Sequence, residues 1–115
     1  MMEVKSDEYH VWYDPQNKSI YCQGSLRLAG TEEYSPIVAI LDAVLAQSPT
    51  LIHLNLCKLE FLNSSGINVL SKFVIKVRQK DGMQINVQGA EDIPWQRKSL
   101  KNLQRLMPSL TLEWL

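Results

Sequence analysis

The stretch that decides the fold is LNLCKLEFLNSSGINVL, which occupies residues 54–70. Its first part is an apolar run typical of a buried strand, and its last part begins an amphipathic helix. Between them stand Ser64, Ser65 and Gly66. This order places two hydroxyls beside the unpaired N–H groups of a helix start, where the helix dipole stabilises a phosphate. Phosphorylation of a serine at such a place would add about −1.5 to −2 charges to the surface.

Composition and charge limit the classes of partner. The chain has 115 residues, 45% of them hydrophobic and 21% charged, which is ordinary for a globular protein, so we expect one domain over residues 1–115. Twelve Lys and Arg residues balance twelve Asp and Glu residues. This balance argues against a nucleic acid or an anionic membrane as the partner, because both bind clustered basic residues. Residues 1–8 are polar and contain no apolar signal core, so we expect a cytoplasmic protein.

Strand and helix patterns alternate along the chain. The patterns predict strands at 9–13, 19–28, 51–57, 83–88 and 110–114, and helices at about 32–46 (or 36–46), 64–82 and 92–107. Strand–helix–strand units require parallel pairing with right-handed crossovers. We therefore predict an α/β sandwich of order β-β-α-β-α-β-α-β, with a mixed sheet and helices packed on one main face. We expect the strand at 51–57 to be covered on both faces, and Thr31 or Ser35 to cap the first helix.

This order of elements, with an SSG step after a buried strand, resembles a STAS domain, the module named for sulfate transporters and anti-sigma factor antagonists. The resemblance covers nearly the whole chain. It is sharpest over residues 54–70, where the family pattern runs roughly L-D-L, a short linker, D-S-S-G-I/L and an apolar helix. A weaker match is GSLRL at residues 24–28, which aligns with the family's G-E-L-D-L.

The resemblance implies a phosphorylation switch. In stand-alone bacterial members of the family, a serine of the SSG step is phosphorylated by a partner-switching kinase that doubles as an anti-sigma factor, and a PP2C-type phosphatase removes the phosphate. The unmodified form binds the kinase, and the phosphorylated form releases it. By this resemblance the partner is a serine/threonine kinase or anti-sigma factor of the histidine-kinase-like ATPase fold. The implied phosphoacceptor is Ser65, with Ser64 as the alternate. The expected partner-binding residues are Arg27, Asn63, Ser64, Ser65, Gly66 and Ile67.

These residues also have local physical roles. Asn63 is a good helix cap, and Gly66 would leave the backbone open for close approach by a partner. Asn63, Asn55 and Arg27 each stand where the family has an aspartate, so each removes a negative charge. If Arg27 lies near Ser65, its guanidinium would stabilise a phosphoserine by a charge-assisted hydrogen bond.

Other interpretations of the same residues remain open. Ser64 and Ser65 are also ordinary capping residues, which would leave an unswitched scaffold or dimerisation module with a degenerated phosphosite. A third alternative is nucleotide binding at a sheet-edge crevice. Trp95 suits an interface anchor if it is exposed.

Enzymatic activity is not expected, and no cofactor is predicted. Ser65 is not in a G-x-S-x-G elbow, and the sequence has no G-x-x-x-x-G-K-S/T phosphate loop. His53 reads as a buried, hydrogen-bonded histidine of a central strand, and Asn55 as a buried amide that holds the following turn. Cys22 and Cys57 read as free, packed thiols in two strands rather than as a disulfide or a metal site.

Overall fold

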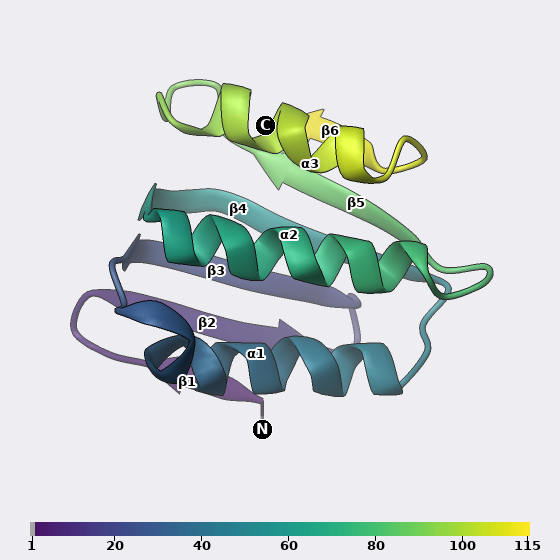
Figure 1. Cartoon of the computed structure of the whole chain (residues 1–115), viewed down its shortest axis with the longest axis horizontal. Coiled ribbons are helices and arrows are strands. Elements are labelled where there is room, and N and C mark those ends of the chain that lie inside the picture. Colours follow the sequence, from purple (N-terminus) through teal and green to yellow (C-terminus); the bar gives the residue numbers. More distant parts are fainter. Residues whose placement is uncertain (1) are drawn as a thin grey trace.

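The computed structural model describes residues 2–115 as one six-stranded mixed sheet with three helices (Figure 1). The elements in chain order are β1 (Glu3–Lys5), β2 (Tyr9–Asp14), β3 (Ser19–Leu26), α1 (Gly30–Ala46), β4 (Leu51–Leu62), α2 (Ser64–Arg78), β5 (Gln84–Gly89), α3 (Gln96–Leu106) and β6 (Thr111–Trp114). The strands lie side by side in this same order. β1, β2 and β3 pair antiparallel, whereas β3 to β6 pair parallel through the helical crossovers. The predicted α/β class and mixed sheet are confirmed.

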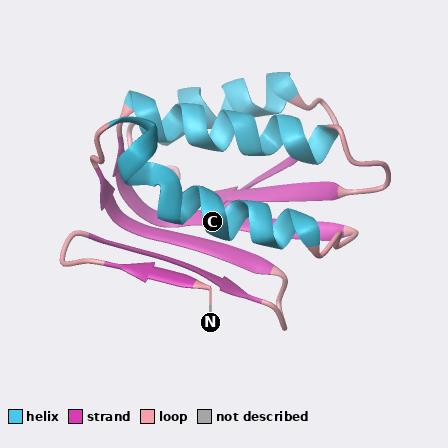
Figure 2. Ribbon diagram, turned by 60° about the horizontal axis from the view of Figure 1, so that its bottom comes forward, coloured by secondary structure: helices cyan, strands magenta, loops and turns pink. Residues whose placement is uncertain are grey.

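All three helices lie on one face of the sheet, as predicted (Figure 2). Alternate strand residues point to that face and form the core with the apolar stripes of the helices. The core includes Val11, Ile20, Cys22, Ile52, Leu54, Leu56, Ile85 and Val87 from the strands, and Ile37, Leu41, Val44, Leu70, Phe73, Val74, Val77, Leu100 and Leu103 from the helices. Cys22 and Cys57 are both free thiols, and burial raises the pKa of Cys22 to about 12.

The expectation that residues 51–57 are covered on both faces is wrong. His53, Asn55 and Cys57 of β4 are only half-buried and alternate with Ile52, Leu54 and Leu56, which are fully buried. No described helix covers the face on which His53 and Asn55 lie. The polar side chains of β4 therefore mark an open face rather than a second layer.

The start of α1 also differs from the prediction. The N-cap is Ala29, without a side-chain cap, and its N–H donates to Glu33 Oε1 at 2.9 Å. Pro36 lies inside the helix. Proline has no N–H to offer the carbonyl of Glu32, one turn earlier. The Ser35 hydroxyl donates to that carbonyl instead, at 2.8 Å, so Ser35 satisfies the helix interior and does not cap its start.

Other elements also differ in extent from the prediction: β3 ends at Leu26 rather than at residue 28, α2 ends at Arg78 rather than near residue 82, and α3 begins at Gln96 rather than at residue 92. The strand β1 was not predicted, since its three residues carry little pattern, yet it pairs with β2 from Glu3↔Trp12 to Lys5↔His10. β4 runs five residues past its predicted end at Cys57, to Leu62, because β3 continues to pair with it across a register shift. This extension carries the chain directly to the start of α2.

Gly24 offers a test of the bend at the end of β3. It has a φ of +89°, and a Cβ added there would collide with the backbone carbonyl oxygen of Glu8. We expect Gly24→Ala to lower the free energy of unfolding by roughly 2–4 kcal/mol, through strain and collision together. Gly82→Ala is the matched control, since Gly82 also has a positive φ of +77° but open space around it. Its expected loss is only about 1–2 kcal/mol. Urea unfolding of both variants measures the difference, and equal losses would contradict this account.

Candidate functional site

The start of α2 is held by the side chain of Asn63, which forms hydrogen bonds in three directions. Its Oδ1 accepts from the N–H of Gly66 at 2.9 Å and from the hydroxyl of Tyr34 at 2.7 Å. Its Nδ2 donates to the carbonyl of Leu28 at 2.8 Å. One amide therefore joins the segment after β3, the helix α1 and the first turn of α2. The predicted cap at Asn63 is confirmed.

The amide at position 63 does what an aspartate could not. A carboxylate would still accept from Gly66 and Tyr34, but it has no donor for the carbonyl of Leu28. Asn63 therefore replaces the acidic residue of the STAS pattern with a group that fits this local structure. Tyr34 is 1% exposed, and its buried hydroxyl has two acceptors, Asn63 Oδ1 at 2.7 Å and the carbonyl of Leu26 at 3.3 Å.

Ser64 and Ser65 form the first turn of α2, directly after the cap. Ser64 is exposed and Ser65 is half-buried. As in every α-helix, the N–H groups of the first turn have no acceptor within the helix. Those of Ser64 and Ser65 therefore point to the end of α2 where the dipole is positive. This local geometry suits a negative group on either hydroxyl.

Gly66 has a different role from the one expected. It is buried, and a Cβ added to it would lie 2.6 Å from the Tyr34 hydroxyl and would collide with the side chain of Leu62. Gly66 therefore serves the packing of α2 against α1 and β4, and it does not open the backbone to a partner. Ile67, the next residue, is half-buried and packs against the edge of the core.

Arg27 lies beside Phe61, and this pairing was not predicted. The guanidinium carbon of Arg27 lies 4.7 Å from the centre of the Phe61 ring, in a cation–π contact. Phe61 is 39% exposed and stands two residues before Asn63. Trp95, which was considered as an anchor, is half-buried, and its indole N–H donates to the carbonyl of Glu60 at 3.0 Å. An arginine and two aromatic residues thus lie near the carboxyl ends of β3 and β4, a composition typical of protein-binding surfaces.

Gln96 supports this end of the sheet from inside, and sequence reasoning did not identify it. It is 0% exposed. Its Oε1 accepts from the N–H of Ala90 at 2.8 Å, and its Nε2 donates to the carbonyls of Leu56 and Leu59 at 2.7 and 3.1 Å. These two carbonyls lie in the part of β4 where its pairing with β3 shifts register twice, so Gln96 pairs polar groups that the irregular ladder leaves without a strand partner.

The two strand residues His53 and Asn55 belong to the open face of the sheet, away from α2. The Nδ1 of His53 lies 3.2 Å from Nδ2 of Asn86, and that amide also donates to Glu113 at 3.0 Å. Hydrogen bonds from Asn86 and Gln88 lower the pKa of Glu113. Asn55 Oδ1 accepts from the N–H of Cys57 at 3.0 Å and so holds the irregular part of β4. The prediction of a buried amide before a turn is wrong, because Asn55 is half-buried and β4 continues to Leu62.

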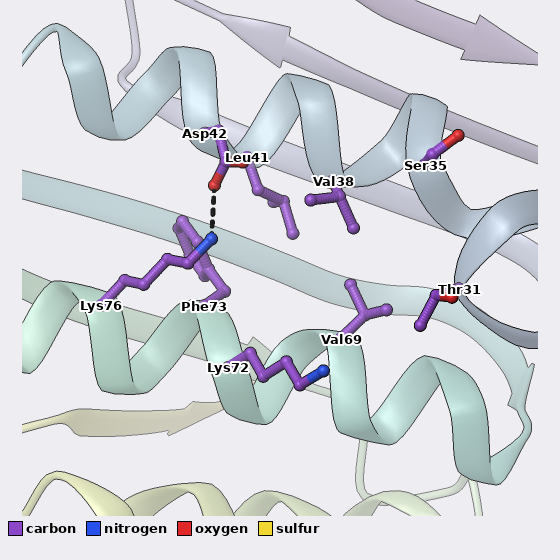
Figure 3. Close-up of a pocket in the computed structure, with 9 residues that line it drawn as sticks. All are labelled: Thr31, Ser35, Val38, Leu41, Asp42, Val69, Lys72, Phe73 and Lys76. Carbon is purple, nitrogen blue, oxygen red and sulfur yellow. Dashed lines mark hydrogen bonds and ion pairs between the residues drawn. The ribbon is translucent and has the colours of Figure 1, made fainter.

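A groove runs between α1 and α2 on the outer side of the helix layer (Figure 3). It has a volume of about 280 Å³, and its apolar lining is Val38, Leu41, Val69 and Phe73. An ion pair between Lys76 Nζ and Asp42 Oδ1, 2.8 Å apart, crosses it toward the carboxyl ends of the helices. Within residues 2–115 no cluster of histidine, cysteine and acidic residues could hold a metal ion. No described helix is long and apolar enough to cross a membrane.

Comparisons with known proteins identify the fold. The sequence matches no protein-family model and no curated protein. Apo-SiaC from Pseudomonas aeruginosa superposes with a TM-score of 0.73 at 13% identity, over 99% of this chain and 98% of that chain. The crystal structure of the diguanylate cyclase SiaD in complex with its activator SiaC, from the same organism, gives 0.74 at 14% identity, over 97% and 96% of the two chains. An anti-sigma factor antagonist from Mycobacterium paratuberculosis gives 0.60 at 19% identity, over 96% and 81%.

The fold is STAS-like. At these identities the likeness concerns the fold, and it confirms at that level the resemblance carried by the SSG step.

The hydrogen bonds of Asn63 can be measured through stability. We expect Asn63→Ala to cost roughly 2–3 kcal/mol of unfolding free energy, because it removes the cap and the donor to the Leu28 carbonyl. It also leaves the Tyr34 hydroxyl with only its longer bond to the carbonyl of Leu26. Asn63→Asp keeps the acceptor oxygen and should cost less, about 1 kcal/mol. Denaturant unfolding of Asn63→Ala, Tyr34→Phe and the double variant gives the coupling, expected at about 0.5–1.5 kcal/mol. Additive losses would show that the two side chains act independently.

Proposed function

We propose that this chain is a single-domain, cytoplasmic regulator that binds a protein partner and is switched by phosphorylation of Ser65, with Ser64 as the alternate site. The observation that carries the proposal is the Asn63-capped start of α2, which presents both hydroxyls at the positive end of a helix. The fold is consistent with this function, since SiaC is the activator of a diguanylate cyclase and the mycobacterial protein is an anti-sigma factor antagonist.

The proposed contact surface surrounds the first turn of α2. Ser64 and Ser65 lie at its centre, and Arg27, stacked on Phe61, lies on the β3 side. A phosphate on Ser65 would insert about −1.5 to −2 charges into a surface fitted to a neutral hydroxyl. Desolvating that charge in the interface costs free energy, so the partner is released. Arg27 could leave Phe61 to pair with the phosphate, because an arginine–phosphate pair is stronger than an exposed cation–π contact.

The partner class follows from the resemblance to STAS regulators. We propose a serine/threonine kinase or anti-sigma factor of the histidine-kinase-like ATPase fold, opposed by a PP2C-type phosphatase. The likeness to SiaC favours a second candidate, in which the bound partner is an enzyme that this chain activates. Both candidates use the same surface and the same switch. They differ in the partner, which is a kinase or anti-sigma factor in the first and an enzyme activated by this chain in the second.

The test compares Ser65→Ala with Ser65→Asp as baits in the source cells. Ser65→Ala should retain the partner constitutively, and Ser65→Asp should retain roughly tenfold less of it. Quantitative mass spectrometry of the two eluates measures the ratio for each captured protein. Ser71→Asp, six residues later on the same helix, is the control for a charge placed elsewhere.

Folding must be separated from binding in this experiment. An aspartate in the first turn of α2 interacts favourably with the helix dipole, by about 0.3–1 kcal/mol. Ser65→Asp should therefore melt at the same temperature as the unmodified chain or a few degrees higher. Equal retention of the partner by a stably folded Ser65→Asp would refute the switch and favour an unswitched scaffold.

A further inference from the structure

The groove between α1 and α2 opens at the same end of the molecule as the candidate phosphosite. Both helices begin at the carboxyl ends of the parallel strands and run in the same direction (Figure 1). Ser65 precedes Val69 by four residues, and Lys72, Phe73 and Lys76 follow at helical spacing. Residues spaced in this way lie on one face of a helix, one turn apart. Ser65 therefore lies on the same face of α2 as the residues that line the groove, one turn before Val69, the first of them.

The groove is apolar at its base and positively charged along the α2 side. Leu41 and Phe73 are each 2% exposed and close the bottom, while Val38 and Val69 are half-buried and form the walls. The charged groups that line it are Lys72, Lys76 and Asp42. Lys76 is paired with Asp42, whereas Lys72 makes no ion pair within the described residues. One lysine is thus available for an acidic group of an occupant (Figure 3).

The shape of the groove favours a helix over a small molecule as the occupant. At about 280 Å³ it is at or below the lower limit of the roughly 300–1,000 Å³ pockets that enclose small ligands. Two helices side by side leave a long furrow between them, and a third helix packs into such a furrow with a row of apolar side chains. The hydroxyls of Thr31 and Ser35 lie on the α1 side of the open end.

We propose that this groove binds an acidic amphipathic helix of the partner, with an apolar side chain between Val38 and Val69 and a carboxylate on Lys72. The inference rests on the proposed function and adds the chemistry of the partner and the reason for its release. A phosphate on Ser65 stands at the open end of the groove, where its charge repels the acidic helix. Ser65 and Lys72 are seven residues apart on α2, or about 10 Å along the helix axis. This distance is about one Debye length, so physiological salt only partly screens the repulsion between the phosphate and a carboxylate bound at Lys72.

The experiment places the photo-crosslinker p-benzoylphenylalanine at position 31, at the exposed open end of the groove, in the source cells. Position 16, in the exposed turn between β2 and β3, serves as the control site. The expected result is an adduct from position 31 to a segment of another protein that has apolar residues at helical spacing and Asp or Glu beside them. Lys72→Glu should lower the yield of this adduct roughly tenfold, while the matched Lys101→Glu on α3 leaves it unchanged.

Several results would overturn the inference: no adduct from position 31, an adduct to a second copy of this chain, or an adduct whose yield does not respond to Lys72→Glu. Ser65→Asp in the same background separates the two proposals. An adduct lost on Lys72→Glu but kept on Ser65→Asp supports the groove and refutes the switch. An adduct kept on Lys72→Glu but lost on Ser65→Asp supports the switch and refutes the acidic helix.

Discussion

The candidate site depends on the hydrogen bonds of the Asn63 side chain. This one amide accepts from the first turn of α2 and from Tyr34 of α1, and it donates to the carbonyl of Leu28 that follows β3. The Gly66 N–H and the Leu28 carbonyl have no regular secondary-structure partner, so their desolvation would be costly without Asn63. The Tyr34 hydroxyl would keep only its longer bond to the carbonyl of Leu26. By satisfying all three, Asn63 fixes where α2 begins relative to α1 and the sheet. The positions of Ser64 and Ser65 follow from that start.

The same arrangement couples the serine to the groove. Ser65 occupies the first turn of the α2 face that continues through Val69 to Lys76, and α1 is held beside that face by the Tyr34–Asn63 bond and by the Lys76–Asp42 ion pair. The ion pair is exposed and contributes little stability by itself, about 0–1 kcal/mol. Because Asp42 pairs with Lys76, it does not neutralise Lys72, the other lysine that lines the groove. A negative charge added at Ser65 therefore acts on a groove whose α2 side carries the positive charge of Lys72.

The sequence predicted the fold and the capped serine step because both depend on local patterns. Apolar periodicity identified the stripes of the three helices, and the order of elements required parallel strands. Asn63 was recognised as a cap because capping depends on residues only three positions apart. The coverage of β4 was predicted wrongly, although the alternation of His53 and Asn55 with aliphatic residues was visible and indicates one open face.

The rest could not be derived from local patterns because it depends on contacts between distant residues. The pairing of Arg27 with Phe61 requires β3 and β4 to end side by side, and the three hydrogen bonds of Gln96 require the register shift in β4. The role of Gly66 was predicted wrongly for the same reason. A glycine after a cap can face solvent or the core, and only the position of Tyr34 shows that it faces the core.

The proposed switch requires that Ser65 be a phosphorylation site. The most direct measurement is phosphosite mapping by mass spectrometry on the protein recovered from its source cells under several growth and stress conditions. The account predicts phosphate on Ser65, in a fraction that changes between conditions. An unmodified Ser65 and Ser64 under every condition, in protein that still binds a partner, would contradict it and leave both serines as parts of a helix cap.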